Sequence, residues 1–221
     1  MNLAWGKLIV ALDLKSQDEI KKVIEVLAPQ VKKFKIGLVA YTKFGPEIIK
    51  WVKEQGGEIF LDFKLYDIPN TMAETAKNFV DLDVWAFTVH LKSGREALEI
   101  LKKKISDYAK EKSKKAPLLI GVTELTSTNA SIEKVLELAR IGKQSDVDGV
   151  VCSVWEAKQI KEALGLLTIT PGIRPKQTSD DQKRAATVKS ALENKADYFV
   201  VGRPIVLEND YLKAAQIVLE S

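Results

Sequence analysis

Short runs of apolar residues alternate along this chain with longer segments in which apolar positions recur every three or four residues. The short runs are rich in Val, Ile and Phe, are bounded by polar residues or Gly, and lie at 8–12, 34–38, 58–62, 84–90, 118–123, 149–153, 167–170 and 198–201. Apolar runs of this length are typical of parallel strands that are buried on both faces. The pattern therefore predicts eight parallel strands.

The segments between these runs carry the signals of helix starts. Ser16, Thr71 and Ser93 are each followed by Glu three positions later, a pattern in which side chains cap the first turn of a helix. Eight strand-and-helix units in 221 residues favour a closed (β/α)8 barrel, or TIM barrel, over an open sheet. No G-x-G-x-x-G follows the first strand, which disfavours a dinucleotide-binding fold. We predict a single barrel domain over residues 1–221.

The charge pattern narrows the classes of partner. The chain has 34 Lys and Arg against 30 Asp and Glu, but seven of the Lys lie between Lys102 and Lys115, so the excess is local. We interpret that segment as a solvated helix face and loop rather than a nucleic-acid site. The longest uncharged stretch, 163–173, is shorter than the ~20 residues of a membrane span, and the N-terminus lacks a signal-peptide pattern. We expect a soluble, cytoplasmic protein that binds neither nucleic acid nor membrane.

The chain has very few residues that could carry out thiol or imidazole chemistry. Cys152 is the only Cys and His90 the only His, which argues against a disulfide framework, a Cys-based zinc site and a His-rich metal centre. We interpret Cys152 as an inert thiol inside an apolar strand. The sequence does not distinguish between two roles for His90, one in the site and one purely structural.

Polar residues gather where the predicted strands end. In a barrel of this kind the active site lies at the carboxyl ends of the strands. Lys35 lies in the second predicted strand, and the residues at or just after the ends of the other strands are Asp13, Asp62, Lys64, His90, Thr126, Ser127, Ser153, Gly172, Arg174, Gly202 and Arg203. We therefore expect one polar rim that carries the chemistry.

The densest charged cluster on this rim follows the third predicted strand. Asp62 and Lys64 are two positions apart, so in a regular strand their side chains point to the same face. With Lys35 from the neighbouring strand and Asp67 beyond, they would form an alternating array of charges, which must be paired if it is partly buried. The competing interpretation is an ion pair that only closes the barrel.

A second cluster combines Gly and Arg after the last two strands. Gly172 and Arg174 follow the seventh strand, and Gly202 and Arg203 follow the eighth. These loops form the usual phosphate site of such barrels, where Gly allows close approach and Arg presents a planar fork to phosphate oxygens. The long polar connection 171–185 is typical of a lid. The competing interpretation of either loop alone is a turn with a surface Arg.

One run of residues is highly specific. The segment 62–71, D-F-K-L-Y-D-I-P-N-T, closely resembles the D-x-K-x-x-D-I-P-N-T signature of the orotidine 5'-phosphate decarboxylase family. Shorter pieces extend the resemblance along the chain in the family's order: A-L-D at 11–13, K-I-G at 35–37, L-T-S at 125–127, P-G-I-R at 171–174 and V-G-R at 201–203. The resemblance implies a homodimeric, cofactor-free TIM-barrel lyase. Its reaction would convert orotidine 5'-phosphate to uridine 5'-phosphate and CO2, the last step of pyrimidine synthesis.

The resemblance also implies roles for individual residues. Lys64 would donate a proton to C6 as the carboxylate leaves, Asp62 would lie against the substrate carboxylate, and Lys35 and Asp67 would complete the charged network. Asp13 and Lys35 would contact the ribose, and Asp67 and Thr71 would reach the ribose in the partner subunit's site. Thr126 and Ser127 would contact the pyrimidine. The phosphate would be held by Arg174, Gly202 and Arg203, with Gln182, favoured over Gln177, as a bridge from the lid.

The chemistry of the residues agrees with these roles. Loss of CO2 from C6 leaves a poorly delocalised carbanion, which a fixed ammonium can stabilise and then protonate. Such a mechanism requires neither a metal nor a prosthetic group.

Three alternatives are open on the sequence. A magnesium-dependent sugar-phosphate lyase, such as hexulose-phosphate synthase or keto-gulonate-phosphate decarboxylase, shares the D-x-K-x-x-D core, although I-P-N-T at 68–71 and G-I-R at 172–174 favour the nucleotide enzyme. A Schiff-base aldolase would need Lys64 or Lys35 as a neutral amine, whereas flanking carboxylates favour the ammonium. A phosphate-binding module would not need the pairing of Asp62 with Lys64.

Overall fold

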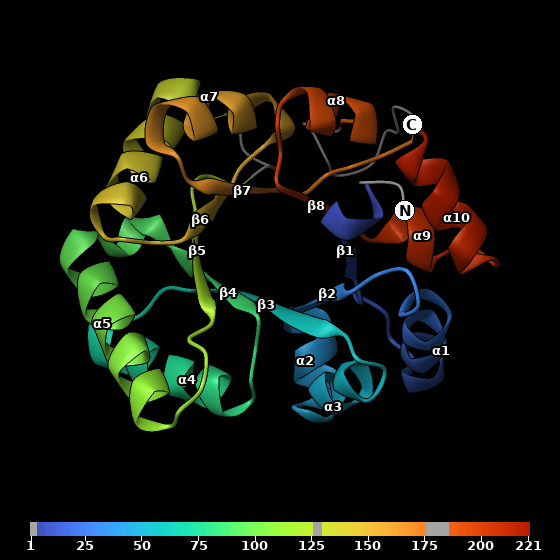
Figure 1. Cartoon of the computed structure of the whole chain (residues 1–221), viewed down its shortest axis with the longest axis horizontal. Helices are drawn as coiled ribbons and strands as arrows, with labels where there is room; N and C mark the ends of the chain where they lie inside the picture. Colours follow the sequence, from blue (N-terminus) through green and yellow to red (C-terminus); the bar gives the residue numbers. More distant parts are fainter. Residues whose placement is uncertain (1–3, 126–129, 176–185) are drawn as a thin grey trace.

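The computed structural model describes residues 4–125, 130–175 and 186–221, and within them eight parallel strands pair in chain order and close into a barrel (Figure 1). The strands are β1 Leu8–Ala11, β2 Lys33–Gly37, β3 Glu58–Leu65, β4 Ala86–His90, β5 Leu118–Val122, β6 Gly149–Val151, β7 Leu167–Thr170 and β8 Tyr198–Val201. Since β8 pairs with β1 as well as with β7, the sheet has no free edge. The predicted TIM barrel is confirmed.

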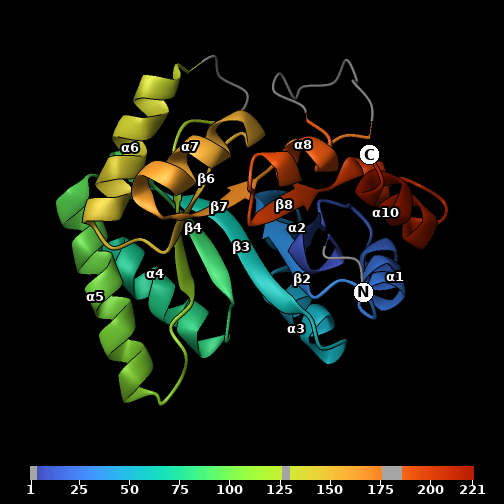
Figure 2. The ribbon, with the colours of Figure 1, turned by 45° about the horizontal axis from the view of Figure 1, so that its top comes forward.

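Helices surround the strands as an outer ring, as the tilted view of Figure 2 also shows. They are α1 Gln17–Leu27, α2 Leu38–Phe44, α3 Glu47–Glu54, α4 Pro69–Asp81, α5 Arg95–Glu111, α6 Ile132–Gln144, α7 Val154–Leu164, α8 Val188–Glu193, α9 Arg203–Val206 and α10 Tyr211–Leu219, with 3-10 turns η1 Trp5–Lys7 and η2 Leu91–Ser93. None of the helices in the described ranges is long and apolar enough to cross a membrane.

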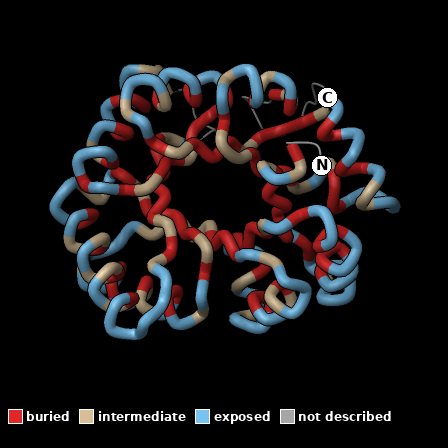
Figure 3. The backbone as a smooth tube through the Cα atoms, viewed as in Figure 1, coloured by how far each residue is buried: buried red, intermediate tan, exposed pale blue. Residues whose placement is uncertain are grey.

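Alternate residues of β1 belong to two different cores. Leu8 and Val10 of β1 pack outward against the helices, whereas Ile9 and Ala11 belong to a smaller cluster. That inner cluster fills the barrel and contains Ile9, Ala11, Phe60, Ala86, Ile120, Ile169 and Val200. Figure 3 shows the resulting arrangement, with buried residues on the strands and the inner sides of the helices and exposed residues outside. Burial on both faces explains why the strands read as unbroken apolar runs.

The helix starts agree only partly with the sequence signals. Ser16 caps α1, as predicted, by accepting a hydrogen bond from the backbone N–H of Glu19. The signals at Thr71 and Ser93 were misleading, because α4 begins earlier, at Pro69, and α5 is preceded by Gly94 without a side-chain cap. Proline suits a first helical position because its missing N–H would have no partner there. Glutamate three residues after Thr or Ser is therefore not sufficient to locate a helix start.

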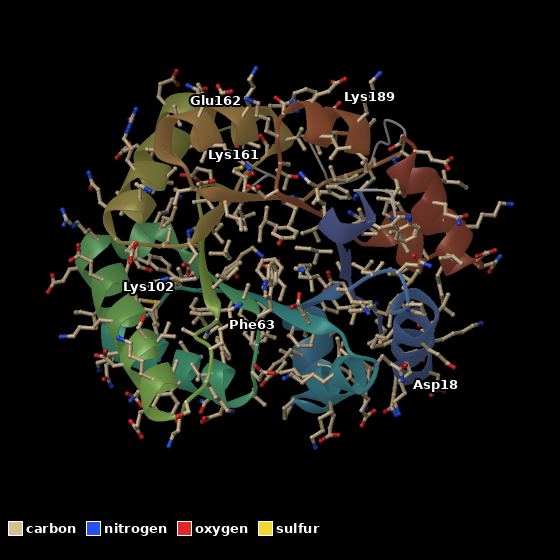
Figure 4. The ribbon with its side chains drawn as sticks, viewed as in Figure 1. Asp18, Phe63, Lys102, Lys161, Glu162 and Lys189 are labelled. Carbon is tan, nitrogen blue, oxygen red and sulfur yellow. The ribbon has the colours of Figure 1, made fainter. Side chains whose placement is uncertain are left out.

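Strand β3 is longer than its apolar run. It was predicted to end at Asp62 but extends to Leu65, so the most polar part of the signature belongs to the strand itself. A further difference is helix α2, which follows β2 directly and was not predicted. Figure 4 labels Phe63 beside β3, and its ring packs against Tyr41 of α2 and Phe79 of α4. These contacts anchor the outer side of β3, so its inner side faces the barrel mouth.

Candidate active site

A cavity of about 580 Å³ opens at the carboxyl ends of the strands. Eight of the predicted site residues line it: Asp13, Lys35, Asp62, Lys64, Gly172, Arg174, Gly202 and Arg203. They come from β2 and β3 and from the loops after β1, β7 and β8. The tertiary structure therefore brings the charged cluster and the Gly/Arg cluster to one cavity, as expected from the geometry of a barrel.

Two lysines and two aspartates form a continuous ionic network on one wall of the cavity. Lys64 Nζ lies 2.9 Å from Asp62 Oδ1, and Lys35 Nζ lies 3.0 Å from Asp13 Oδ2 and 3.7 Å from Asp62 Oδ2. Asp62 therefore has a lysine at each of its oxygens. The two charges of each sign balance, which lowers the cost of holding them away from bulk water.

Burial and charge act in opposite directions on Asp62. Its side chain is only 15% exposed, and burial alone would raise the pKa of the carboxyl group. Lys35, Lys64 and the hydroxyl of Thr88 more than offset burial, so the pKa of Asp62 is lowered below its usual 3.8. The carboxylate is therefore charged at neutral pH, and it faces a cavity with a cation on either side.

The Asp62–Lys64 pair depends on an irregular strand. Leu61 pairs with Phe87 and Leu65 with Val89, so three residues of β3 lie opposite one residue of β4. Lys64 has a φ of 51°, a left-handed conformation that costs an L-residue about 1–2 kcal/mol. The two side chains do lie side by side as predicted, but a bulge brings them together rather than the regular alternation of a strand. Strain held at such a point is typical of functional sites.

Gly37 leaves the space that this network occupies. A Cβ atom at this position would lie 2.7 Å from Asp13 Oδ1 and 3.0 Å from Lys35 Nζ. Any side chain here would therefore displace the Asp13–Lys35 pair. Glycine at the end of the K-I-G segment, where β2 ends and α2 begins, therefore provides the space that this ion pair needs.

The opposite wall of the cavity carries the Gly/Arg cluster. Arg174 is buried, and its Nη1 donates a hydrogen bond to the carbonyl oxygen of Ile173 at 2.8 Å. Gly172 has a φ of +83°, which glycine adopts at little cost. Gly202 precedes the short helix α9, which Arg203 begins. Two cationic side chains and backbone that lacks side-chain bulk thus face the cavity from neighbouring loops, an arrangement suited to an anion.

Asp67 and Thr71 do not line the cavity of their own chain. Both are exposed, and an oxygen of Asp67 accepts a hydrogen bond from the Ile68 N–H at 2.7 Å. Within the described residues of a single chain, Asp67 forms no ion pair with Lys35 or Lys64, so its place in the charged array stays a prediction. Thr126, Ser127, Gln177 and Gln182, with most of the expected lid, lie outside the described residues.

The structure adds residues that the sequence did not single out. Thr88 of β4 contacts both Asp62 and Lys64, and Glu124, paired with Lys92, lines the cavity. The only indication of Thr88 in the sequence is its polarity among apolar neighbours, which does not by itself point to a functional role.

Cys152 and His90, the residues considered for thiol and imidazole chemistry, are not among the described residues that line the cavity. Burial raises the pKa of Cys152 well above its usual value, which agrees with an inert thiol. His90 packs against Tyr66, and its Nδ1 is buried without a hydrogen-bond partner among the described residues. Burial, followed by Lys92, lowers the pKa of His90, so a neutral imidazole is favoured. Within the described ranges no group of three or more His, Cys, Asp or Glu side chains could hold a metal ion.

Comparison with known proteins agrees with this site. The chain is 39% identical to orotidine 5'-phosphate decarboxylase of Dictyoglomus thermophilum, over 93% of this chain and 91% of that protein. It is 41% identical to the enzyme of that name from Carboxydothermus hydrogenoformans, over 97% and 95%. The crystal structure of orotidine 5'-phosphate decarboxylase from Lactobacillus acidophilus superimposes with a TM-score of 0.82 at 34% identity, covering 97% of this chain and 98% of that one.

A family model also matches nearly the whole chain. It is described as "Orotidine 5'-phosphate decarboxylase / HUMPS family" and matches residues 6–218. This range includes every strand of the barrel and both walls of the cavity. The chain therefore belongs to the orotidine 5'-phosphate decarboxylase / HUMPS family.

Proposed function

We propose that the protein decarboxylates orotidine 5'-phosphate to uridine 5'-phosphate and CO2, the last step of pyrimidine nucleotide synthesis. The family description covers a second group of enzymes besides the decarboxylases, but the similar full-length relatives carry the decarboxylase name. The observation that carries the proposal is the Lys35–Asp62–Lys64 network on a cavity wall. We place the enzyme in the cytoplasm, since its substrate and product are charged nucleotides that do not cross membranes freely.

Lys64 acts on the carbon that loses CO2. Its side chain is 37% exposed and lines the cavity, and its ammonium is held by Asp62 at 2.9 Å. As the bond from C6 to the carboxylate breaks, the electron pair stays on C6, and a preorganised cation beside that carbon stabilises the developing charge. The same ammonium then transfers a proton to C6 to complete the product. Because no electron sink is required, the chain's own residues supply the chemistry.

Asp62 and Lys35 prepare the site for that step. The charged Asp62 holds the Lys64 ammonium in place and lies beside the position of the substrate carboxylate. Lys35 bridges Asp62 and Asp13, so the network stays balanced while its members contact the ribose. Fixed dipoles and charges of this kind do not need to reorganise as the reaction proceeds.

The phosphate binds at the other wall. Arg174, Gly202 and Arg203 line the cavity there, and the guanidinium groups match phosphate oxygens in geometry and charge. Binding energy from this remote group would position C6 against Lys64, so that it contributes to turnover as well as to affinity. The proposal assigns Thr126, Ser127 and Gln182 to the pyrimidine and the lid on the family pattern alone.

The assay that tests the proposal follows the absorbance of orotidine 5'-phosphate with purified, chelator-treated protein. We expect full turnover in EDTA and none with Lys64→Ala. Turnover that strictly required added magnesium would favour the sugar-phosphate lyase, and a covalent adduct trapped by borohydride would favour the aldolase. Tight nucleotide binding without any turnover would indicate a binding module.

We further propose that the protein is a homodimer in which Asp67 and Thr71 complete the partner's site. In support, both residues are exposed and separated from their own cavity, and neighbouring Tyr66 and Ile68 are 65% and 66% exposed. Adjacent apolar side chains on a surface are typical of an interface. The segment would then place a carboxylate where the partner's network needs one.

Subunit mixing tests this shared site. We expect Lys64→Ala and Asp67→Asn dimers to be inactive separately. After exchange of subunits, half of the dimers combine one chain of each kind and contain one intact site, so about a quarter of wild-type activity should return. Mixing each variant with itself is the control. Failure to recover activity, once exchange has been verified by mass, would contradict the role of Asp67.

A further inference from the structure

We propose that Thr88 is a positioning residue for the reaction, whose buried hydroxyl holds the Lys64 backbone and one oxygen of Asp62 in the productive arrangement. The inference rests on the proposed decarboxylase function. It concerns a residue of β4 that touches the charged network from behind, on the side away from the substrate.

The hydroxyl of Thr88 joins two parts of the network at once. Thr88 is fully buried, at 0% exposure. Its Oγ1 accepts a hydrogen bond from the backbone N–H of Lys64 at 2.8 Å and donates one to Asp62 Oδ1 at 3.1 Å. A hydroxyl has a single hydrogen to donate, so the directions of these two hydrogen bonds are fixed. The Lys64 N–H donates to Thr88, and the Thr88 O–H donates to Asp62.

The first of these contacts stabilises an unusual backbone. Lys64 is in the left-handed region, with φ 51°, at the bulge where three residues of β3 lie opposite one residue of β4. That single residue, between Phe87 and Val89, is Thr88. Its side chain therefore supplies a hydrogen-bond acceptor at the point where the strand pairing is interrupted, and the direction of the Lys64 side chain depends on this turn of the backbone.

The second contact selects which oxygen of Asp62 faces which lysine. Oδ1 receives both the Thr88 hydroxyl and the Lys64 ammonium, at 3.1 Å and 2.9 Å, whereas Oδ2 lies 3.7 Å from Lys35 Nζ. Without the hydroxyl the carboxylate could rotate about its last torsion, and the Lys64 ammonium would move with it. Thr88 thus closes a ring of contacts through the Lys64 backbone and side chain.

Thr88 itself is fully buried and absent from the described residues that line the cavity, so we expect it to make no direct contact with a bound nucleotide. Its removal should therefore leave affinity for nucleotide nearly unchanged and act on turnover, because orientation of Lys64 is needed only for the chemical step. A residue that merely supported the fold would lower stability without this separation of kcat from binding.

The test compares Thr88→Val with a matched control. Valine has the shape of threonine but no hydroxyl. Thr168 of β7 offers the control, because it is equally buried and its hydroxyl also joins an aspartate and a backbone N–H, those of Asp197, in both cases at 3.3 Å. Asp197 pairs with Lys161 and does not line the cavity. Thr168→Val therefore removes the same kind of contacts away from the reaction.

We expect Thr88→Val to lower kcat by roughly ten- to a hundredfold, the effect of losing a buried hydrogen bond to a charged group. The dissociation constant of uridine 5'-phosphate should change by less than about threefold. Thr88→Ser should restore kcat to within about threefold of wild type, since it keeps the hydroxyl. Thr168→Val should leave kcat unchanged while lowering the melting temperature about as much as Thr88→Val does.

Two outcomes would overturn the inference about Thr88. One is a Thr88→Val variant with the kcat of an active wild type. The other is a loss that Thr88→Ser does not restore, or that Thr168→Val shows equally. A wild-type protein that binds uridine 5'-phosphate but does not decarboxylate orotidine 5'-phosphate would instead refute the proposed function, so the two failures are distinguishable.

Discussion

Lys33 and Lys35 lie two residues apart on β2 and are buried to nearly the same extent, with side chains 14% and 11% exposed, but their surroundings differ. Lys33 pairs with Glu58 at 2.8 Å and lies over the rings of Trp85 and Tyr198. Lys35 contacts Asp13 and Asp62 and faces the cavity. One strand therefore carries a lysine to each end of the barrel.

Aromatic rings occupy the interior at the amino end of the barrel, whereas the carboxyl end opens into the larger of the two cavities described. Trp85 and Tyr198 are in ring contact with each other, and Trp85 also contacts Phe60, so aromatic rings occupy the space beneath Lys33. At the other end, the 580 Å³ cavity leaves the lysines and aspartates facing space that a ligand can enter. The two lysines are buried alike, but they differ in their partners and in the open volume beside them.

The comparison shows that a buried, paired lysine is not in itself a sign of function. At the amino end one cation is satisfied by one carboxylate and two aromatic faces, an arrangement that stabilises the closed barrel. At the carboxyl end two cations share two carboxylates, and a further charged group can enter. Variants at each end should therefore separate stability from activity.

The largest effect should come from Lys64→Ala. Removing both the cation beside C6 and the proton donor should lower kcat by at least about a thousandfold. The affinity for uridine 5'-phosphate should remain within about fivefold of wild type, because the phosphate wall is untouched. Steady-state kinetics and calorimetric titration measure the two quantities. A variant with near-normal turnover would exclude Lys64 from the proposed role.

Substituting methionine for each lysine of β2 tests the contrast between the two ends directly. We expect Lys35→Met to lower kcat/KM by roughly a hundredfold, since it leaves two carboxylates without their shared cation. Lys33→Met should keep kcat/KM within about twofold and lower the free energy of unfolding by about 1–2 kcal/mol. Kinetics and urea denaturation are the measurements. Equal losses of activity in both variants would contradict the division.

A smaller effect is expected from Gly37→Ala. Its new Cβ would meet Asp13 and Lys35 at 2.7 Å and 3.0 Å, so the pair must shift, and kcat/KM should fall about tenfold. Gly6→Ala is the control, because nothing lies within 4 Å of a Cβ there. Unchanged activity of Gly37→Ala would indicate that the position of the Asp13–Lys35 pair matters little.

The smallest effect concerns pH and stability. Because the folded-state pKa of Asp62 lies below its usual 3.8, the charged carboxylate contributes stability above the unfolded-state value and loses it as pH falls through the lower folded-state value. The free energy of unfolding of the wild type should therefore increase relative to that of Asp62→Asn as pH rises from about 2 to 5. Urea denaturation over this range is the measurement, and a constant difference would contradict it.

Much of the fold was predictable because it depends on local pattern. Eight apolar runs, buried on both faces, specify parallel strands, and Ser16 specifies the start of α1. The signals at Thr71 and Ser93 misled, because Pro69 and Gly94 nearby set the helix boundaries instead. Boundaries depend on which of several competing local preferences prevails, and packing decides between them.

The residue types of the site were likewise predictable from the sequence, because lysines, aspartates, glycines and arginines occur at the ends of the predicted strands. The D-x-K-x-x-D-I-P-N-T run identified the family. The contacts between these residues were not predictable. The bulge at Lys64 and the hydroxyl of Thr88 behind Asp62 depend on pairing between β3 and β4, and the room at Gly37 depends on side chains from β1 and β2. The amino-acid sequence specifies local preferences and residue types. Distances between residues remote in sequence are set only when the barrel closes, because closure fixes the register of each strand against its neighbour.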